Sequence, residues 1–340
     1  RDQPRSRGLG DVYKRQVEVG KNQIPSDSNN VRWESSANTM TAQPLNEPIL
    51  GYSPGSPERN SITQEIDRQM SETIEIPCII NGEEVFTGHT IPQVIPHNHG
   101  HILANVHLAG REEMESACSA AVNAQRSWIE IGLEERCKIF EKCADLLAGD
   151  WRMRVNASTM LNQSKTVFQA EIDSACELID FWRFNCHYAR GFHDDFQPLV
   201  SPEGVVNSTD IRPLEGFVLS ITPFNFTSIA ANLPSAPAIV GCTSVWKPSR
   251  NSYYSNYYLM RLMMEAGLPP GVINFLPGSG ADITEVALSN PNFAGLHFTG
   301  STATFQGLWQ EIGLALPKLN SYPRIVGCLL YTSPSPRDRG

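Results

Sequence analysis

Two polar residues stand just beyond short apolar runs of strand length. Phe217–Ile221 precedes Asn225 by a short turn, and Thr243–Trp246 delivers Lys247 at its carboxyl end. In an open parallel sheet, ligands bind in the crevice outside the carboxyl ends of the strands. A carboxamide N–H can stabilise a developing oxyanion, and an ammonium group can contact polar groups of a ligand. The spacing therefore predicts a ligand site that contains Asn225 and Lys247.

Two glycine-containing turns follow later strands of the same pattern. Gly278-Ser279-Gly280 follows a strand as a dinucleotide-binding loop would, although Ile283 stands where that fingerprint has its third glycine. Phe298–Ser301 ends another strand, and a helix begins immediately after it. The N–H groups and positive end of such a helix can receive a pyrophosphate, with the Ser301 hydroxyl as a further donor. A simple helix cap is the structural alternative.

The other polar candidates also have structural interpretations. Asn225 could cap the helix that follows it, and its N-x-T context spells a glycosylation acceptor. Lys247 could extend its ammonium to the surface. Four carboxylates of one predicted helix could include an acid/base pair, but a solvated helix face is favoured for Glu171, Asp173, Glu177 and Asp180.

Three histidines alternate along the chain, so on a strand they would share one face: His97, His99 and His101. No carboxylate or cysteine at a zinc-ligand spacing accompanies them. A polar turn is favoured over a metal site, and we expect no metal.

The elements that position these residues alternate in type. Strands are predicted at Phe217–Ile221, Thr243–Trp246, Val272–Leu276 and Gly295–Phe298. The helices are predicted as a segment capped by Thr227, Tyr253–Ala266 ended by Gly267, Ala281–Leu288 and Thr302–Gly313. Strands that alternate with helices imply a parallel sheet covered on both faces. The predicted fold class is therefore α/β, doubly wound.

The first half of the chain reads as mostly helical. A helix is predicted around Ile62, Ile66 and Met70, and Asn81-Gly82 predicts a β-hairpin with a type I′ turn. Further helices are predicted at Arg111–Trp128, Leu133–Leu147, Arg154–Leu161 and Phe168–Tyr188.

The bulk composition is that of an ordinary globular protein. The chain has 340 residues, of which 41% are hydrophobic and 19% charged. A net charge of -9 argues against a nucleic-acid partner, and no apolar run reaches the roughly 18 residues that span a bilayer. The eight cysteines form no C-x-x-C pair, so buried free thiols in a reducing compartment are expected.

Several sequence blocks resemble the aldehyde dehydrogenase superfamily. The TPFNF block that contains Asn225 is followed after a helix by WKPS, which contains Lys247. Further blocks are NEPIL (46–50), GSPER (55–59), NHGH (98–101), AEIDSACELIDFWRFN (170–185), EAGLPP (265–270) and FTGS (298–301). The resemblance covers about residues 46–327 and narrows to one subfamily. It implies NAD-dependent oxidation of a small aldehyde, L-glutamate 5-semialdehyde, to L-glutamate in proline degradation, in the mitochondrial matrix.

The resemblance also assigns roles to residues. It implies that Asn225 stabilises the oxyanion and that Lys247, with Ser249 beside it, contacts the adenosine ribose. It implies further contacts with the dinucleotide from Thr222, Gly278, Gly300, Ser301, Thr302, Ala303 and Thr304. Residues 197–212, with a β-like stretch at Gly204–Ile211, are implied to belong to a strand that pairs with another subunit of a homo-oligomer.

The sequence departs from the family after Tyr322–Gly327. In the family this segment leads into the glutamate that acts as general base, but Cys328 stands there, and the nucleophilic cysteine has no counterpart. We expect residues 1–44 to be an unstructured leader or artefact, 45–327 an NAD-binding domain, and 328–340 a non-native tail. The alternatives are a nucleotide-binding or interaction module from a short isoform, or an aldehyde dehydrogenase of other specificity.

The 340-residue chain alone is predicted to have no dehydrogenase turnover, because it offers neither the base nor the nucleophile. The measurement is NADH absorbance after purified chain is mixed with NAD and L-glutamate 5-semialdehyde. Turnover at the rates of intact family members would contradict this expectation. Saturable NAD binding without turnover would agree with it.

Overall fold

A computed structural model describes residues 43–198 and 200–329. Its larger sheet has seven strands in the order β10-β9-β6-β7-β8-β2-β3. The first five strands in that order are parallel, whereas β2 and β3 are antiparallel at one edge. The strands are β2 (Cys78–Ile80), β3 (Glu83–Val85), β6 (Phe217–Ile221), β7 (Thr243–Lys247), β8 (Ile273–Phe275), β9 (Phe293–Gly300) and β10 (Arg324–Leu329). The predicted fold class is confirmed.

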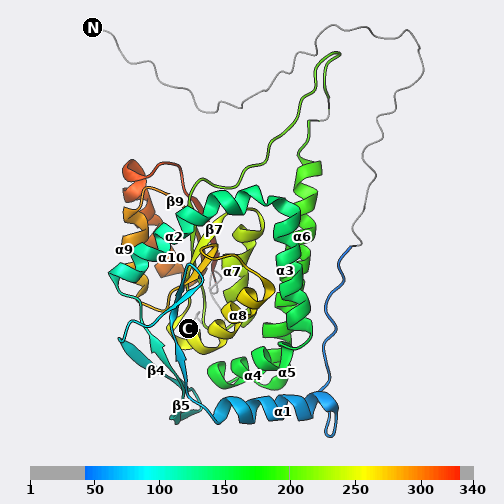
Figure 1. Ribbon diagram of the computed structural model, residues 1–340, viewed down its shortest axis with the longest axis vertical. Coiled ribbons are helices and arrows are strands. Elements are labelled where there is room, and N and C mark those ends of the chain that lie inside the picture. The colour runs from blue at the N-terminus through cyan, green and yellow to red at the C-terminus, as the bar shows by residue number, and fades with distance from the viewer. Residues whose placement is uncertain (1–42, 199, 330–340) are drawn as a thin grey trace, which may run out of the picture.

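Helices cover both faces of the sheet, because its central strands are apolar on both sides. One core cluster joins the sheet to α7 and α8, on which α6 and α3 pack in turn, and the other joins it to α2, α9 and α10 (Figure 1). These helices are α2 (Arg111–Glu130), α3 (Gly132–Ala148), α6 (Glu177–Asp195), α7 (Thr227–Ile239), α8 (Tyr253–Ala266), α9 (Gly280–Ser289) and α10 (Thr302–Ala315). Short 3-10 turns lie at Arg250–Ser252 and Leu316–Lys318.

The predicted strands and helices of residues 217–315 are all present, with ends that differ by at most a few residues. One cap differs. The N-cap of α7 is Phe226, whose side chain makes no capping bond, so the prediction that Thr227 caps this helix is wrong. The Thr227 hydroxyl instead bonds to Thr159 and accepts a hydrogen bond from Gln163. It therefore ties α7 to a neighbouring helix, α4 (Arg152–Gln163).

The predicted β-hairpin is confirmed as β2 and β3. Asn81 and Gly82 both have positive φ, 53° and 78°, as a type I′ turn requires. Ile79 also pairs with Phe275 of β8, so the hairpin closes one edge of the large sheet. The edge at the other end, β10, includes Cys328 and Leu329, the first two residues of the predicted tail; residues 330–340 lie outside the described residues.

A second, three-stranded sheet has the order β1-β5-β4, with β1 (Ile74–Ile76), β4 (Thr90–Ile95) and β5 (Asn98–His107). The turn between β4 and β5 holds His97, whose Nδ1 lies 2.7 Å from the Ser164 hydroxyl. His99 and His101 lie on β5 instead of in a turn. Within residues 43–198 and 200–329, no group of three or more His, Cys, Asp or Glu side chains could hold a metal ion.

The helices of the first half lie close to their predicted positions. The remaining ones are α1 (Pro57–Met70), α5 (Val167–Ala170) and a π-helical stretch at Glu171–Cys176 that continues directly into α6. Beyond α6, residues 204–211 form no strand, and this part of the chain runs out from the body of the molecule as an extended arm (Figure 1). Its pairing with another subunit stays a prediction. No helix of the described part is long and apolar enough to cross a membrane.

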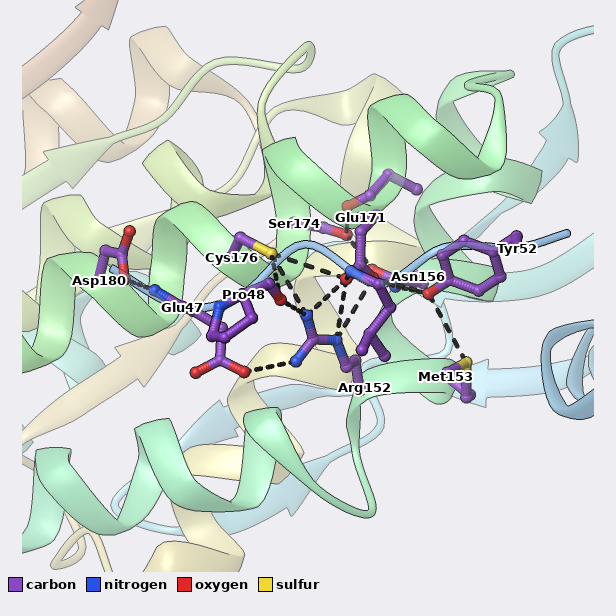
Figure 2. Close-up of polar contacts among 12 residues, drawn as sticks. Glu47, Pro48, Tyr52, Arg152, Met153, Asn156, Glu171, Ser174, Cys176 and Asp180 are labelled. Carbon is purple, nitrogen blue, oxygen red and sulfur yellow. Dashed lines mark hydrogen bonds and ion pairs between the residues drawn. The ribbon is translucent and has the colours of Figure 1, made fainter. Parts of the chain in front are cut away.

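The π-helical stretch contains Glu171, for which the prediction of a solvated helix face is wrong. Glu171 is not on a solvated face: it is fully buried and forms an ion pair with Arg152 at 2.5 Å (Figure 2). The carboxylate also accepts hydrogen bonds from the Tyr52 hydroxyl, the Leu50 N–H and the Asn156 amide, at 2.7, 2.8 and 2.8 Å. The other three carboxylates of the predicted face are partly buried.

The same cluster anchors the segment that precedes α1. Arg152 donates to the Glu47 carboxylate at 2.6 Å and to the Pro48 carbonyl at 2.7 Å (Figure 2). Arg183 reaches the other oxygen of Glu47 at 2.7 Å. Burial by itself would raise the pKa of Glu171, but the hydrogen bonds from Arg152 and Tyr52 bring that pKa below its usual range. The pair is thus charged and fully partnered.

Glu171→Gln is predicted to lower the free energy of unfolding by about 3–5 kcal/mol, because it removes the fully buried charge that pairs with Arg152 and leaves the guanidinium only the Glu47 carboxylate. Urea denaturation followed by circular dichroism measures the change. The carboxylate contributes stability above an unfolded-state pKa of about 4.3, and that contribution is lost as pH falls through the lower folded-state pKa. The matched control is Glu130→Gln in the exposed pair with Arg126, where less than about 1 kcal/mol is expected. Equal losses in both variants would contradict the prediction.

Candidate functional site

The carboxyl ends of four parallel strands meet at one edge of the large sheet. Ile221 of β6 is in register with Lys247 of β7 and with Phe298 of β9, and Trp246 is in register with Phe275 of β8. The turns that follow these strands therefore lie side by side. This edge carries the residues predicted from the sequence: Thr222, Asn225, Lys247, Ser249, Gly278, Gly300 and the first turn of α10.

Asn225 lies in the turn between β6 and α7 and does not cap the helix, because Phe226 holds the cap position. Its side-chain oxygen is buried and has no hydrogen-bond partner among the described residues. A buried amide oxygen without a partner is costly. Asn225 is thus held at this edge by its neighbours and not by bonds of its own oxygen.

Lys247 is a half-buried lysine at the end of β7. Its ammonium has neither an ion-pair nor a hydrogen-bond partner within residues 43–198 and 200–329. Burial lowers the pKa of Lys247, because the low-dielectric surroundings disfavour the charged form. A Cβ atom added to Gly280 would lie 3.8 Å from Nζ, so the ammonium lies beside the turn that starts α9. An unpaired cation at this edge can bind hydroxyl or anionic groups of a ligand.

The Gly278-Ser279-Gly280 turn is already engaged within the protein. The Gly278 N–H donates to the Tyr253 hydroxyl at 3.1 Å, and that hydroxyl lies 3.3 Å from the Gly278 carbonyl. The Ser279 hydroxyl caps α9 by accepting from the Asp282 N–H. The Gly278 N–H is therefore not available to a phosphate, and a ligand would meet this turn mainly at Gly280.

The turn between β9 and α10 is exposed. Ser301 caps α10, accepting a hydrogen bond from the Thr304 N–H at 3.2 Å, so the simple-cap interpretation of its hydroxyl is confirmed. A Cβ atom on Gly300 would lie 2.6 Å from the Phe298 ring, which explains the glycine at that position. The positive end of this 14-residue helix faces the same sheet edge, with Thr302 and the exposed Ala303 in its first turn.

Two further predicted residues flank Lys247. The Thr222 N–H donates to the Lys247 carbonyl at 3.2 Å, and its hydroxyl accepts from the Trp246 indole at 3.1 Å. The Ser249 carbonyl accepts from the Ser252 N–H.

Two surface hollows, of about 370 and 240 Å³, are lined by residues outside this sheet edge, the first beside Lys138 and the second beside Arg261.

Sequence reasoning missed the pair of Lys165 and Asp173. The two side chains form an ion pair, and the Lys165 ammonium lies over the ring of Phe226, the neighbour of Asn225. Their spacing in the chain gives no signal, because the contact depends on how the helices pack.

A comparison with protein families identifies the family of this chain. The family model described as "Aldehyde dehydrogenase family" matches residues 85–320. The chain belongs to the aldehyde dehydrogenase family.

Within that family, the chain is similar to delta-1-pyrroline-5-carboxylate dehydrogenases. It is 47% identical over 283 residues to the protein of that name from Agaricus bisporus, a match that covers 83% of this chain and 52% of that protein. It is 40% identical over 297 residues to the mitochondrial protein of that name from Homo sapiens, covering 87% and 52%. The chain thus spans about half the length of these relatives.

Solved structures give the same result. The crystal structure of the Delta-pyrroline-5-carboxylate dehydrogenase from Mycobacterium tuberculosis bound with NAD superposes with a TM-score of 0.82 at 48% identity, over 84% of this chain and 53% of that chain. 1-Pyrroline-5-carboxylate dehydrogenase from Thermus with bound NAD gives a TM-score of 0.77 at 26% identity, over 85% and 56%.

Lys247 is predicted to lose its proton at lower pH than Lys138, since burial lowers the pKa of Lys247 whereas a hydrogen bond to Glu135 raises that of Lys138. NMR titration of the lysine Cε–Hε signals measures both, with Lys247→Arg and Lys138→Arg to assign them. Equal titration midpoints would mean that Lys247 is solvated and not held at the sheet edge.

Proposed function

We propose that this chain is the NAD-binding part of an enzyme that oxidises L-glutamate 5-semialdehyde to L-glutamate in proline degradation. The observation that carries the proposal is the half-buried, unpaired Lys247 beside Gly280, at the sheet edge that also holds Asn225 and the start of α10. Similarity to delta-1-pyrroline-5-carboxylate dehydrogenases, one of them bound with NAD, supports the same substrate and cofactor.

The residues at this edge fit a dinucleotide. Lys247, with Ser249 beside it, would hold the adenosine ribose hydroxyls, because its ammonium has three donors and no partner among the described residues. Gly300 to Thr304 would receive the pyrophosphate at the N-terminus of α10. Thr222 and Gly278 would line the turns on either side, through atoms other than the engaged Gly278 N–H. Bound NAD supplies a hydride acceptor.

Asn225 would act on the aldehyde. Its side-chain N–H groups donate to the oxygen that becomes negatively charged when a thiolate attacks the carbonyl, and such a donor is worth about 3–4 kcal/mol in the transition state. The thiolate and the general base would come from sequence outside these 340 residues.

The remaining features follow from the same proposal. Residues 45–327 form the NAD-binding domain, and the arm at residues 197–212 joins subunits of a homo-oligomer. The mitochondrial matrix is the proposed location, supported by the word mitochondrial in the names of the human and Dictyostelium discoideum relatives; the name of the Agaricus bisporus relative lacks that word.

Lys247→Met is predicted to weaken NAD binding about 10- to 100-fold, because it removes hydrogen bonds from a charged donor, each worth about 1.5–3 kcal/mol. Isothermal titration calorimetry with the 340-residue chain measures the dissociation constant. Lys138→Met removes an exposed lysine far from this edge and is the matched control, with no change expected. Equal NAD affinity in the two variants, or no NAD binding by the unmodified chain, would contradict the proposed cofactor site.

A further inference from the structure

The segment from Asn225 to Ser228 is held from the side of α4 and α6. The Thr227 hydroxyl lies 2.9 Å from that of Thr159 on α4. The Ser228 hydroxyl donates to the Glu177 carboxylate at the start of α6, at 2.9 Å. Each of these contacts fixes a residue after Asn225, and both are made by helices outside the sheet.

Phe226 has a contact of a different kind. The Lys165 ammonium lies 4.5 Å from the centre of the Phe226 ring, within the range of a cation–π interaction. The same ammonium forms an ion pair with Asp173 at 2.5 Å, and the two side chains are only 13% and 18% exposed. A partly buried ion pair is screened less than a surface pair, so the cation is held firmly against the ring.

The geometry of Asp173 depends on the π-helical stretch at Glu171–Cys176. A π-helical turn contains more residues than an α-helical one, which shifts the direction of the side chains it carries. Within this stretch Glu171 bonds to Arg152 while Asp173 reaches Lys165. The buried Arg152–Glu171 pair therefore fixes the backbone from which Asp173 extends.

Asn225 itself lacks such anchors. Its side-chain oxygen has no partner within the described residues, so its orientation is set through the backbone it shares with Phe226. Of the side-chain contacts named above, the cation against the Phe226 ring is the one made to the residue directly beside Asn225.

We propose that Lys165 is a positioning residue: it holds Phe226 through a cation–π contact, with Asp173 as its anchor, and so sets the direction of the Asn225 amide. The importance of that direction for aldehyde oxidation rests on the proposed function. The contact itself is a property of this chain and can be tested without substrate or cofactor.

The test is an NMR spectrum of the 340-residue chain labelled with 15N-asparagine. Asn225→Asp identifies the side-chain NH₂ signals of Asn225 by their loss. Lys165→Met is expected to shift both signals towards those of solvent-exposed asparagines and to lower their 15N–1H nuclear Overhauser effect. Lys165→Arg keeps a cation and is expected to restore the unmodified signals, as a merely space-filling role would not require.

Lys138→Met is the matched control, because Lys138 also pairs with a carboxylate, that of Glu135, but on the exposed surface, and its variant should leave the Asn225 signals unchanged. Unchanged Asn225 signals in a folded Lys165→Met chain would overturn the proposal. If that variant does not fold, Asp173→Asn decides, since it keeps the lysine and removes the anchor; unchanged signals would again overturn it. Failure of NAD to bind would affect the proposed function and not this result.

Discussion

The structure depends on one buried ion pair, between Arg152 and Glu171. It joins segments that are distant in sequence: the stretch before α1 through Glu47, the start of α4, and the π-helical stretch that leads into α6 (Figure 2). Two charges removed from water are tolerated only when every remaining donor and acceptor is satisfied. Tyr52, Leu50 and Asn156 complete the partners of the carboxylate, so these segments must assemble together.

The segments that this ion pair joins also contact the candidate site. The segments fixed by the ion pair supply Thr159 of α4, Lys165 of the loop after α4 and Glu177 of α6, and these contact the three consecutive residues after Asn225. The sheet supplies the other half of the site, because the register of β6, β7 and β9 places Thr222, Lys247 and the start of α10 at one edge. The Asn225 amide thus lies where the sheet edge meets the layer of helices that the ion pair joins.

The sequence predicted the elements whose signals are local. β6 matches its apolar run, α8 ends at Gly267 with φ of 102°, and Asn81-Gly82 forms the predicted hairpin turn. Burial of Glu171 could not be predicted, because its partners Arg152 and Tyr52 are brought to it only by packing. The helical pattern alone placed the carboxylate on a solvated face.

In the candidate site, too, local features were predictable and contacts made by packing were not. Lys247 was placed correctly at a strand end, since the apolar run and Pro248 are both visible in the sequence. The engagement of the Gly278 N–H by Tyr253 was not predictable, because the hydroxyl comes from the start of another helix. The contact of Lys165 with Phe226 likewise depends on the position of α7 against α4 and α6.

The closure of the sheet by β2 has a consequence for synthesis. Ile79 pairs with Phe275, and most of the described chain lies between them. At about 5–20 residues per second, the ribosome releases the hairpin roughly 10 s or more before its neighbour strand exists. During that interval β2, whose three residues are all buried in the finished molecule, lacks its β8 neighbour, so an apolar strand of the nascent chain keeps an unpaired edge until β8 is made.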